Sequence, residues 1–169
     1  MSISVYAVSV PVFKQGLNSL KEVLKKAEAY AAARHIEADA LLEARLFPDM
    51  FHLIRQVQIA ADFAKGVSAR LAGVEAPSHD DSEASFADLQ VRLDKTLAFI
   101  ATLKPEQFVG AETRDIVLRP GTPKEKRFTG HDYLLHYGLQ HFFFHTTTAY
   151  DILRHNGVEI GKADYIGTY

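Results

Sequence analysis

Residues 129–157 read TGHDYLLHYGLQHFFFHTTTAYDILRHNG, and this stretch decides the fold. Its inward-facing residues recur at alternating steps of three and four, which is the spacing along one face of an α-helix. That face consists of Leu134, Gly138, His141, His145, Thr148 and Ile152. Asp132 suits the positive first turn of such a helix, and Gly157 suits its end. The stretch therefore predicts a long helix with two histidines on its inward face.

Three further segments have the same helical spacing, over residues 4–33, 48–71 and 82–105. Pro11 is expected in the first turns of the first helix or at a kink, because proline lacks the amide hydrogen that a helix interior uses. Pro48 and the aspartate after it suit the start of the second helix. Four helices with apolar seams predict an antiparallel four-helix bundle.

The connection between residues 105 and 129 is too long for a bundle turn and contains two extended runs separated by Pro120, Gly121 and Pro123. It predicts a short β-hairpin or extended crossover between the third and fourth helices. Residues 158–169 are expected to pack on the bundle without regular structure. The predicted fold class is all-α, as a single domain over residues 1–169.

The composition is that of a soluble globular domain, with 47% apolar and 24% charged residues in a chain of 169. A formal net charge of -2 argues against a nucleic-acid-binding surface. No apolar run reaches the roughly 18 residues needed to span a bilayer. The N-terminus lacks the basic region of a secretory signal. We therefore expect a cytoplasmic protein that binds neither nucleic acid nor membrane.

The chain has eight histidines and no cysteine, so histidine and carboxylate side chains are the available metal ligands. His141 and His145 lie four residues apart, with about 6 Å of helical rise between them, so both rings can reach one ion. His52 is predicted one turn inside the second helix. If that helix is the antiparallel neighbour of the fourth, the three imidazoles form an open site for a divalent metal such as Zn or Ni.

The alternative is that the inward-facing rings form hydrogen bonds with polar neighbours, as buried histidines often do. Five such neighbours are available: Gln56, Gln140, Thr146, Thr147 and Thr148. Four of the remaining histidines are interpreted as surface or terminal residues: His35, His79, His131 and His155. His136 lies about 140° around the helix from His141 and is not expected to share its ligand. Asp49 and Asp62 are interpreted as capping and surface groups rather than general bases.

Two other features carry hypotheses about binding. Phe142, Phe143 and Phe144 point in three directions and make the fourth helix apolar nearly all round, so it needs cover on more than one side. The cover comes either from the hairpin and tail or from a second copy of the chain in a homodimer. The run KEKR over residues 124–127 is interpreted as a solvated hairpin face, with an anion site as the other interpretation.

Four segments carry a family resemblance: RQVQIAADFAK at 55–65, ARLAGVE at 69–75, AYDILRHNGV at 149–158 and IGK at 160–162. Together they resemble a bacterial family of unknown function in the DinB/YfiT-like superfamily, which includes metalloenzymes. The resemblance covers nearly the whole chain. It implies a DinB-like bundle, commonly dimeric, with a metal held by one histidine of the second helix and two of the last. By position these are His52, His141 and His145.

Characterised members of the wider superfamily include thiol-dependent S-transferases and a mycothiol-dependent isomerase. The resemblance thus implies a divalent metal (Zn or Ni) and a low-molecular-weight thiol as cofactors. In close relatives, Pro and Asn often stand at the positions of His52 and His141, so the metal site need not be general. Two functions remain open: a metal-dependent hydrolase, transferase or isomerase, and a non-catalytic dimeric bundle that binds a partner or a small apolar ligand.

Overall fold

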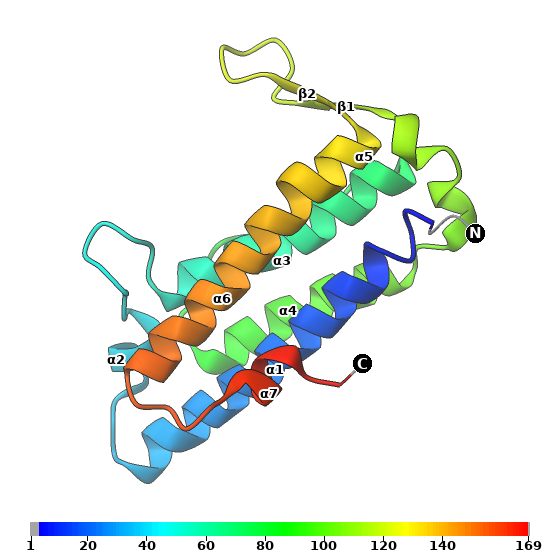
Figure 1. Cartoon of the computed structure of the whole chain (residues 1–169). Helices are drawn as coiled ribbons and strands as arrows, with labels where there is room; N and C mark the ends of the chain where they lie inside the picture. The colour runs from blue at the N-terminus through cyan, green and yellow to red at the C-terminus, as the bar shows by residue number, and fades with distance from the viewer. Residues whose placement is uncertain (1–3, 169) are drawn as a thin grey trace.

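The computed structural model describes residues 4–168 as a stack of long helices with a hairpin at one end (Figure 1). The long helices are α1 (Val10–Ala33), α3 (Leu53–Ala72), α4 (Phe86–Ala101) and α6 (Leu139–His155). The last is continuous with α5 (Gly130–Asp132) and the π-helix η3 (Tyr133–Gly138). The shorter elements are α2 (Ala38–Leu42), η1 (Pro105–Phe108), η2 (Ala111–Thr113), β1 (Asp115–Leu118), β2 (Lys126–Thr129) and α7 (Lys162–Ile166).

The long helices pack through one apolar core. Helix α3 lies against α6 and α4, and α1 lies against α4 and α6. The largest fully buried apolar side chains are Phe13, Leu17, Leu24, Leu42, Leu53, Leu71, Leu89, Leu93, Ile100, Tyr133 and Phe142. The prediction of a mostly helical chain with a short antiparallel hairpin is confirmed. Within residues 4–168, no helix is long and apolar enough to cross a membrane.

Glycines set how closely two pairs of elements approach. A Cβ on Gly138 would lie 2.8 Å from Val67 Cγ2, so the absence of a side chain lets η3 lie against α3. A Cβ on Gly130 would lie 1.8 Å from the carbonyl oxygen of Ala111, so the absence of a side chain lets η2 pack closely on α5. These contacts hold the hairpin end of the helical stack together.

Arg92 joins α4 to α3 and to the loop between them, and it is only 2% exposed. Its guanidinium contacts Asp62 Oδ1 at 2.9 Å, Glu83 Oε1 at 3.0 Å and the Asp80 carbonyl oxygen at 3.1 Å. A buried guanidinium is tolerated because several acceptors replace its lost hydration. The Arg92 contacts bind the loop to the helices.

The structure corrects two predicted helix starts. The first helix begins at Val10 rather than near residue 4, with Pro11 in its first turn as expected. The second begins at Leu53 rather than at Pro48. The backbone before it is diverted from the helix because side chains bind its carbonyl groups: Arg45 binds that of Met50, and Gln56 binds that of Phe51.

The prediction for the segment between α4 and α5 is confirmed, whereas the prediction for the C-terminal tail is wrong. The predicted hairpin is present, with β1 and β2 antiparallel in a register that pairs Asp115 with Thr129 and Leu118 with Lys126. The tail was expected to lack regular structure, but it contains α7. That helix has an Asp164 side chain accepting from the Gly161 N–H at 2.8 Å, and it packs on α1. Residues 1–3 and 169 of the predicted domain lie outside the described residues.

The variant Gly130→Ala tests the close approach at the hairpin end. Because the new Cβ would overlap a backbone oxygen, the free energy of unfolding should fall by about 2–3 kcal/mol in urea denaturation. Gly161→Ala is the control, since its Cβ would meet no atom within 4 Å. A change at Gly130 no larger than the change at Gly161 would show that the contact is not a constraint.

Candidate functional site

His145 is buried in α6 and faces α3. Its Nδ1 lies 2.7 Å from Oε1 of Gln56. The Gln56 amide nitrogen donates to the carbonyl oxygen of Phe51 at 3.0 Å, so the amide oxygen is the atom turned toward the ring. The Nδ1–H of His145 therefore donates to Gln56, and the lone pair lies on Nε2. Of the polar neighbours considered from the sequence, Gln56 is the one that binds a histidine.

Burial determines the charge of His145. Desolvation lowers its pKa to about 4, and the nearby His141 and Arg55 act in the same direction. The partner of its N–H is a neutral amide rather than a carboxylate, so no opposite charge stabilises the protonated ring. His145 is a neutral hydrogen-bond acceptor at pH 7.

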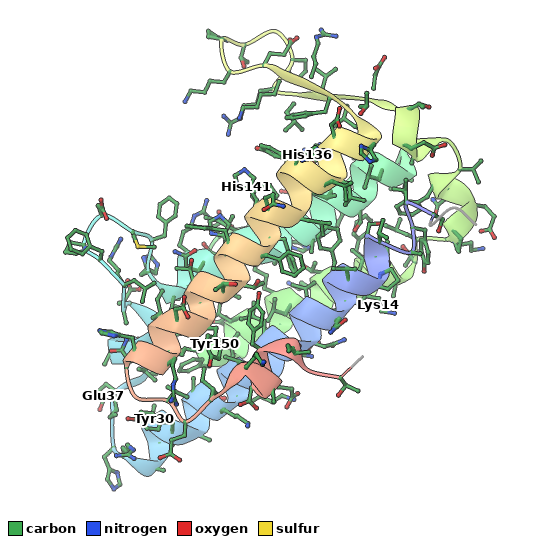
Figure 2. The ribbon with its side chains drawn as sticks, viewed as in Figure 1. Lys14, Tyr30, Glu37, His136, His141 and Tyr150 are labelled. Atoms are coloured by element: carbon green, nitrogen blue, oxygen red, sulfur yellow. The ribbon has the colours of Figure 1, made fainter. Side chains whose placement is uncertain are left out.

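His141 is half-buried and stacks flat on an aromatic ring from α3. Its ring centroid lies 4.4 Å from that of Phe63, with 4° between the planes. Tyr137 of η3 approaches the other ring edge at 4.4 Å and 58°. Burial lowers the pKa of His141, and Lys126 adds to the effect. Figure 2 shows His136 and His141 on the η3–α6 rod, toward the hairpin.

His141 and His145 are brought together, with ring centroids 6.4 Å apart and planes 15° from parallel. His52 is not inside the second helix as expected. It precedes α3, and its Nδ1 lies 3.4 Å from Arg45 Nη2 and 3.7 Å from Glu43 Oε2. Within residues 4–168, no three His, Cys, Asp or Glu side chains are grouped to hold a metal ion. Imidazole nitrogens suit Zn or Ni as ligands. Of the three predicted ligands, only His141 and His145 lie close together. The metal site therefore stays a prediction.

The carboxylates considered from the sequence offer no free base beside these rings. Asp62 Oδ1 contacts Arg92 at 2.9 Å and Lys65 Nζ at 3.1 Å, so it is part of an ion-pair network. Asp49 is exposed. His79 differs from its expected surface position, because it is half-buried and its Nδ1 has no partner among the described residues.

A cleft of about 340 Å³, here called the hairpin cleft, opens beside His141 between α3, η3 and the hairpin. Phe63 and Tyr137 belong both to its wall and to the surroundings of His141. Its lining consists of Asp62, Phe63, Val67, Arg70, Val117, Leu118, Arg119, Pro120, Tyr133 and Tyr137. The cleft therefore combines aromatic faces with two guanidinium groups.

A second hollow, here called the α7 pocket, lies between α1 and α6 under α7. It has a volume of about 180 Å³ and a mostly apolar lining. The lining consists of Val12, Gln15, Gly16, Ser19, Leu20, Val23, Phe143, Thr146, Tyr150, Tyr165 and Ile166. Tyr150 lies where α6 passes α7 (Figure 2), and its ring meets that of Tyr165 edge-on at 5.7 Å.

Comparison with known proteins gives a family and a fold. The model of a family described as "Domain of unknown function (DUF1993)" matches residues 5–166. The chain belongs to the DUF1993 family. A crystal structure of a DinB family member protein from Shewanella denitrificans is 42% identical, with a TM-score of 0.92 over 98% of this chain and 93% of that chain. No curated protein matches the chain. The DinB-like resemblance seen in the sequence is confirmed.

Two aromatic residues of this DUF1993 protein were not assigned to the site from the sequence, although their spacing is informative. Tyr137 precedes His141 and His145 by four and eight residues, so the three side chains share one side of the rod. Phe63 follows Gln56 by seven residues, which places both on the same face of α3. The predicted homodimer stays a prediction.

The lowered pKa of His145 predicts a pH dependence of stability. Between its ordinary pKa of 6.5 and its folded pKa of about 4, the unfolded chain binds more protons at this residue than the folded chain does. The free energy of unfolding should therefore fall as the pH falls through this window, with His145 contributing about 3 kcal/mol.

The measurement is urea denaturation of the wild type and of His145→Gln at pH values between 7 and about 4. The difference in unfolding free energy between the two proteins should shrink as the pH falls, since the variant has no ring to protonate. Parallel curves would show that His145 is not held neutral by burial.

Proposed function

We propose that this DinB-like four-helix bundle is a non-catalytic protein that binds a small apolar molecule in the α7 pocket. The observation that carries the proposal is an apolar hollow of about 180 Å³ with no unpaired buried polar atom among the lining residues that the structure describes. A dry cavity of comparable size, about 150 Å³, is known to bind benzene. The ligand expected here is therefore a one-ring or two-ring aromatic or an aliphatic molecule of similar size.

Apart from Tyr150, the polar side chains that line the α7 pocket form hydrogen bonds within the chain. Ser19 Oγ donates to the Gln15 carbonyl oxygen at 3.0 Å, and Thr146 Oγ1 donates to that of Phe142 at 3.0 Å. The Gln15 amide donates to the carbonyl oxygen of Ile166 at 3.0 Å. Among residues 4–168, none of the buried polar atoms without a partner belongs to the pocket lining. The pocket thus demands no polar ligand.

Helix α7 forms one wall of the α7 pocket and is held by contacts that are individually weak. Lys26 Nζ contacts Asp164 Oδ1 at 2.6 Å, and this hydrogen bond, with that from the Gly161 N–H, lowers the pKa of Asp164. The Tyr165 hydroxyl lies 2.9 Å from Thr147 Oγ1. Exposed ion pairs contribute little to stability, so a five-residue helix held in this way can adjust its position to fit a ligand.

The chemistry of the histidine pair is consistent with a binding role. A general base works best with a pKa near the operating pH, whereas the pKa of His145 is about 4. Its partner Gln56 is neutral and does not raise the basicity of the ring.

Indole is a suitable probe for the α7 pocket, because the chain has no tryptophan and excitation at the long-wavelength edge of indole absorption avoids the seven tyrosines. We expect a Kd below about 1 mM in a fluorescence titration. Val12→Phe fills the pocket from a half-buried position and should weaken binding by at least about tenfold. Val91→Phe is the matched control, since Val91 is 51% exposed on α4, away from the pocket.

Two results would contradict the proposal. One is the absence of saturable indole binding to a folded wild-type protein. The other is equal binding by Val12→Phe and Val91→Phe, which would place the probe elsewhere on the surface.

A second proposed function is a metal-dependent enzyme that uses His141, His145 and His52. The observation that favours it is the Gln56–His145 hydrogen bond, because metal-bound histidines characteristically donate their other ring N–H to an acceptor. A bound Zn²⁺ or Ni²⁺ would act as a Lewis acid that polarises a substrate or favours the thiolate of a low-molecular-weight thiol. His52 would have to leave Arg45 to join the other two rings.

Zinc content after dialysis tests this second function on protein without a histidine tag. His145→Ala should lose bound zinc, because it removes the Nε2 lone pair that Gln56 leaves available. The control His136→Ala should retain zinc, since His136 is exposed on η3. A folded wild type without zinc, or equal zinc in the two variants, would exclude the metal site.

A further inference from the structure

We propose that the hairpin cleft binds a planar organic anion, of which an aromatic carboxylate is the simplest representative. The hairpin and α7 lie apart in the molecule (Figure 1). The cleft is lined by the hairpin, α3 and η3, and the α7 pocket by α1, α6 and α7, so this proposal does not rest on the proposed function. Three observations carry it: cations without competing carboxylates, flat aromatic walls, and a glycine that fixes one cation in place.

Cationic groups converge on the hairpin cleft from two elements. Arg70 of α3 and Arg119 of the hairpin line it. Lys126 of β2 lies over one of its walls, with Nζ 5.3 Å from the centroid of the Tyr137 ring. Arg119 follows β1 in the left-handed region with a φ of 51°, which non-glycine residues rarely adopt. The amide and hydroxyl of Thr122 both donate to its carbonyl oxygen and hold that turn.

The carboxylates near the hairpin cleft are committed to other partners. Asp62, the acidic residue of the lining, is bound by Arg92 and Lys65. Glu125 of the hairpin accepts from the Gly121 N–H at 2.7 Å and from Arg127 Nε at 2.8 Å. Among residues 4–168, no carboxylate forms an ion pair with Arg70 or Arg119, and an anionic ligand would complement their guanidinium groups.

The walls of the hairpin cleft are suited to a flat ring. Tyr133 and Tyr137 of η3 stack with centroids 5.8 Å apart and 21° between their planes. The Phe63 ring meets that of Tyr137 at 5.8 Å from the α3 side. Val67, Val117, Leu118 and Pro120 complete an apolar surround. An inorganic anion would use the charges but not these surfaces, which favours an anion with an aromatic body.

Gly66 keeps the Arg70 guanidinium in position. A Cβ on Gly66 would lie 2.7 Å from Arg70 Nη1, so the arginine folds back over a glycine in the interior of α3. The same Nη1 donates to the Tyr133 hydroxyl at 3.2 Å. Glycine in a helix interior lowers helix stability relative to alanine. We attribute the glycine at position 66 to the need to hold the Arg70 guanidinium at the cleft before a ligand binds.

The probe is 1-naphthoate, measured by isothermal titration calorimetry against neutral 1-naphthamide and against inorganic phosphate. We expect 1-naphthoate to bind with a Kd below about 1 mM and at least about tenfold more tightly than the other two. Amide NMR signals of Gly66 and Val117 should shift, whereas those of Gly16 and Tyr165 in the α7 pocket should not.

Two variants test the role of Arg70. Arg70→Gln should weaken 1-naphthoate binding by at least about tenfold. Gly66→Ala should weaken it as well by displacing the guanidinium, while Tm stays the same or rises by about 2–4 °C from the gain in helix propensity. Arg127→Gln is the control, because it removes a positive charge of the hairpin from a side chain that is 73% exposed and paired with Glu125. It should bind within about twofold of the wild type.

The proposal is overturned if 1-naphthamide binds as tightly as 1-naphthoate, since the charge would then play no part. Phosphate binding of equal strength would show that the aromatic walls are not used. Equal losses in Arg70→Gln and Arg127→Gln would reduce the effect to overall charge. If Gly66→Ala fails to fold, the comparison of Arg70→Gln with Arg127→Gln decides.

Discussion

The close packing of α3 against the η3–α6 rod is the contact on which the rest of the structure depends. It is made where Gly138 lies against Val67, a place where any side chain on residue 138 would force the two elements apart. With the two elements this close, Gln56 forms its hydrogen bond with His145, and Phe63 stacks on His141. Further along α3, Arg70 donates a hydrogen bond to the Tyr133 hydroxyl. The histidine pair and the hairpin cleft are therefore consequences of one glycine contact.

The buried Arg92 has a second influence on the chemistry of this interface. Its burial is expensive unless acceptors surround it, and Asp62, Glu83 and the Asp80 carbonyl oxygen serve that purpose. Desolvation opposes the charged form, but the carboxylates of Glu83, Asp62 and Asp81 raise the pKa of Arg92 overall. Because Asp62 is used in this way, it is not available as a base beside the histidines.

Periodicity was a sound guide to the long helices, and the turn residues around Pro120 were a sound guide to the hairpin. Both signals depend only on residues close together in the sequence, so they can be recognised without knowing the fold. The start of α3 depends instead on Arg45 and Gln56 binding backbone carbonyl groups, which spacing does not reveal. His52 therefore precedes α3 and lies beside Arg45 instead of standing one turn inside the helix. Helix α7 is too short to show a period, and the π-helix η3 continues the apolar pattern of its neighbours.

The apolar character of the fourth helical rod is largely accounted for within one chain. Phe142 meets Phe13 edge-on at 5.0 Å in the core. Tyr137 lies against Phe128 of the hairpin at 5.3 Å, and Phe143 lines the α7 pocket. Phe144 remains 56% exposed. Since the hairpin and α7 each cover the rod incompletely, each leaves a hollow beside it. The hairpin cleft and the α7 pocket therefore lie where the hairpin and α7 each meet the η3–α6 rod and leave part of its apolar surface uncovered.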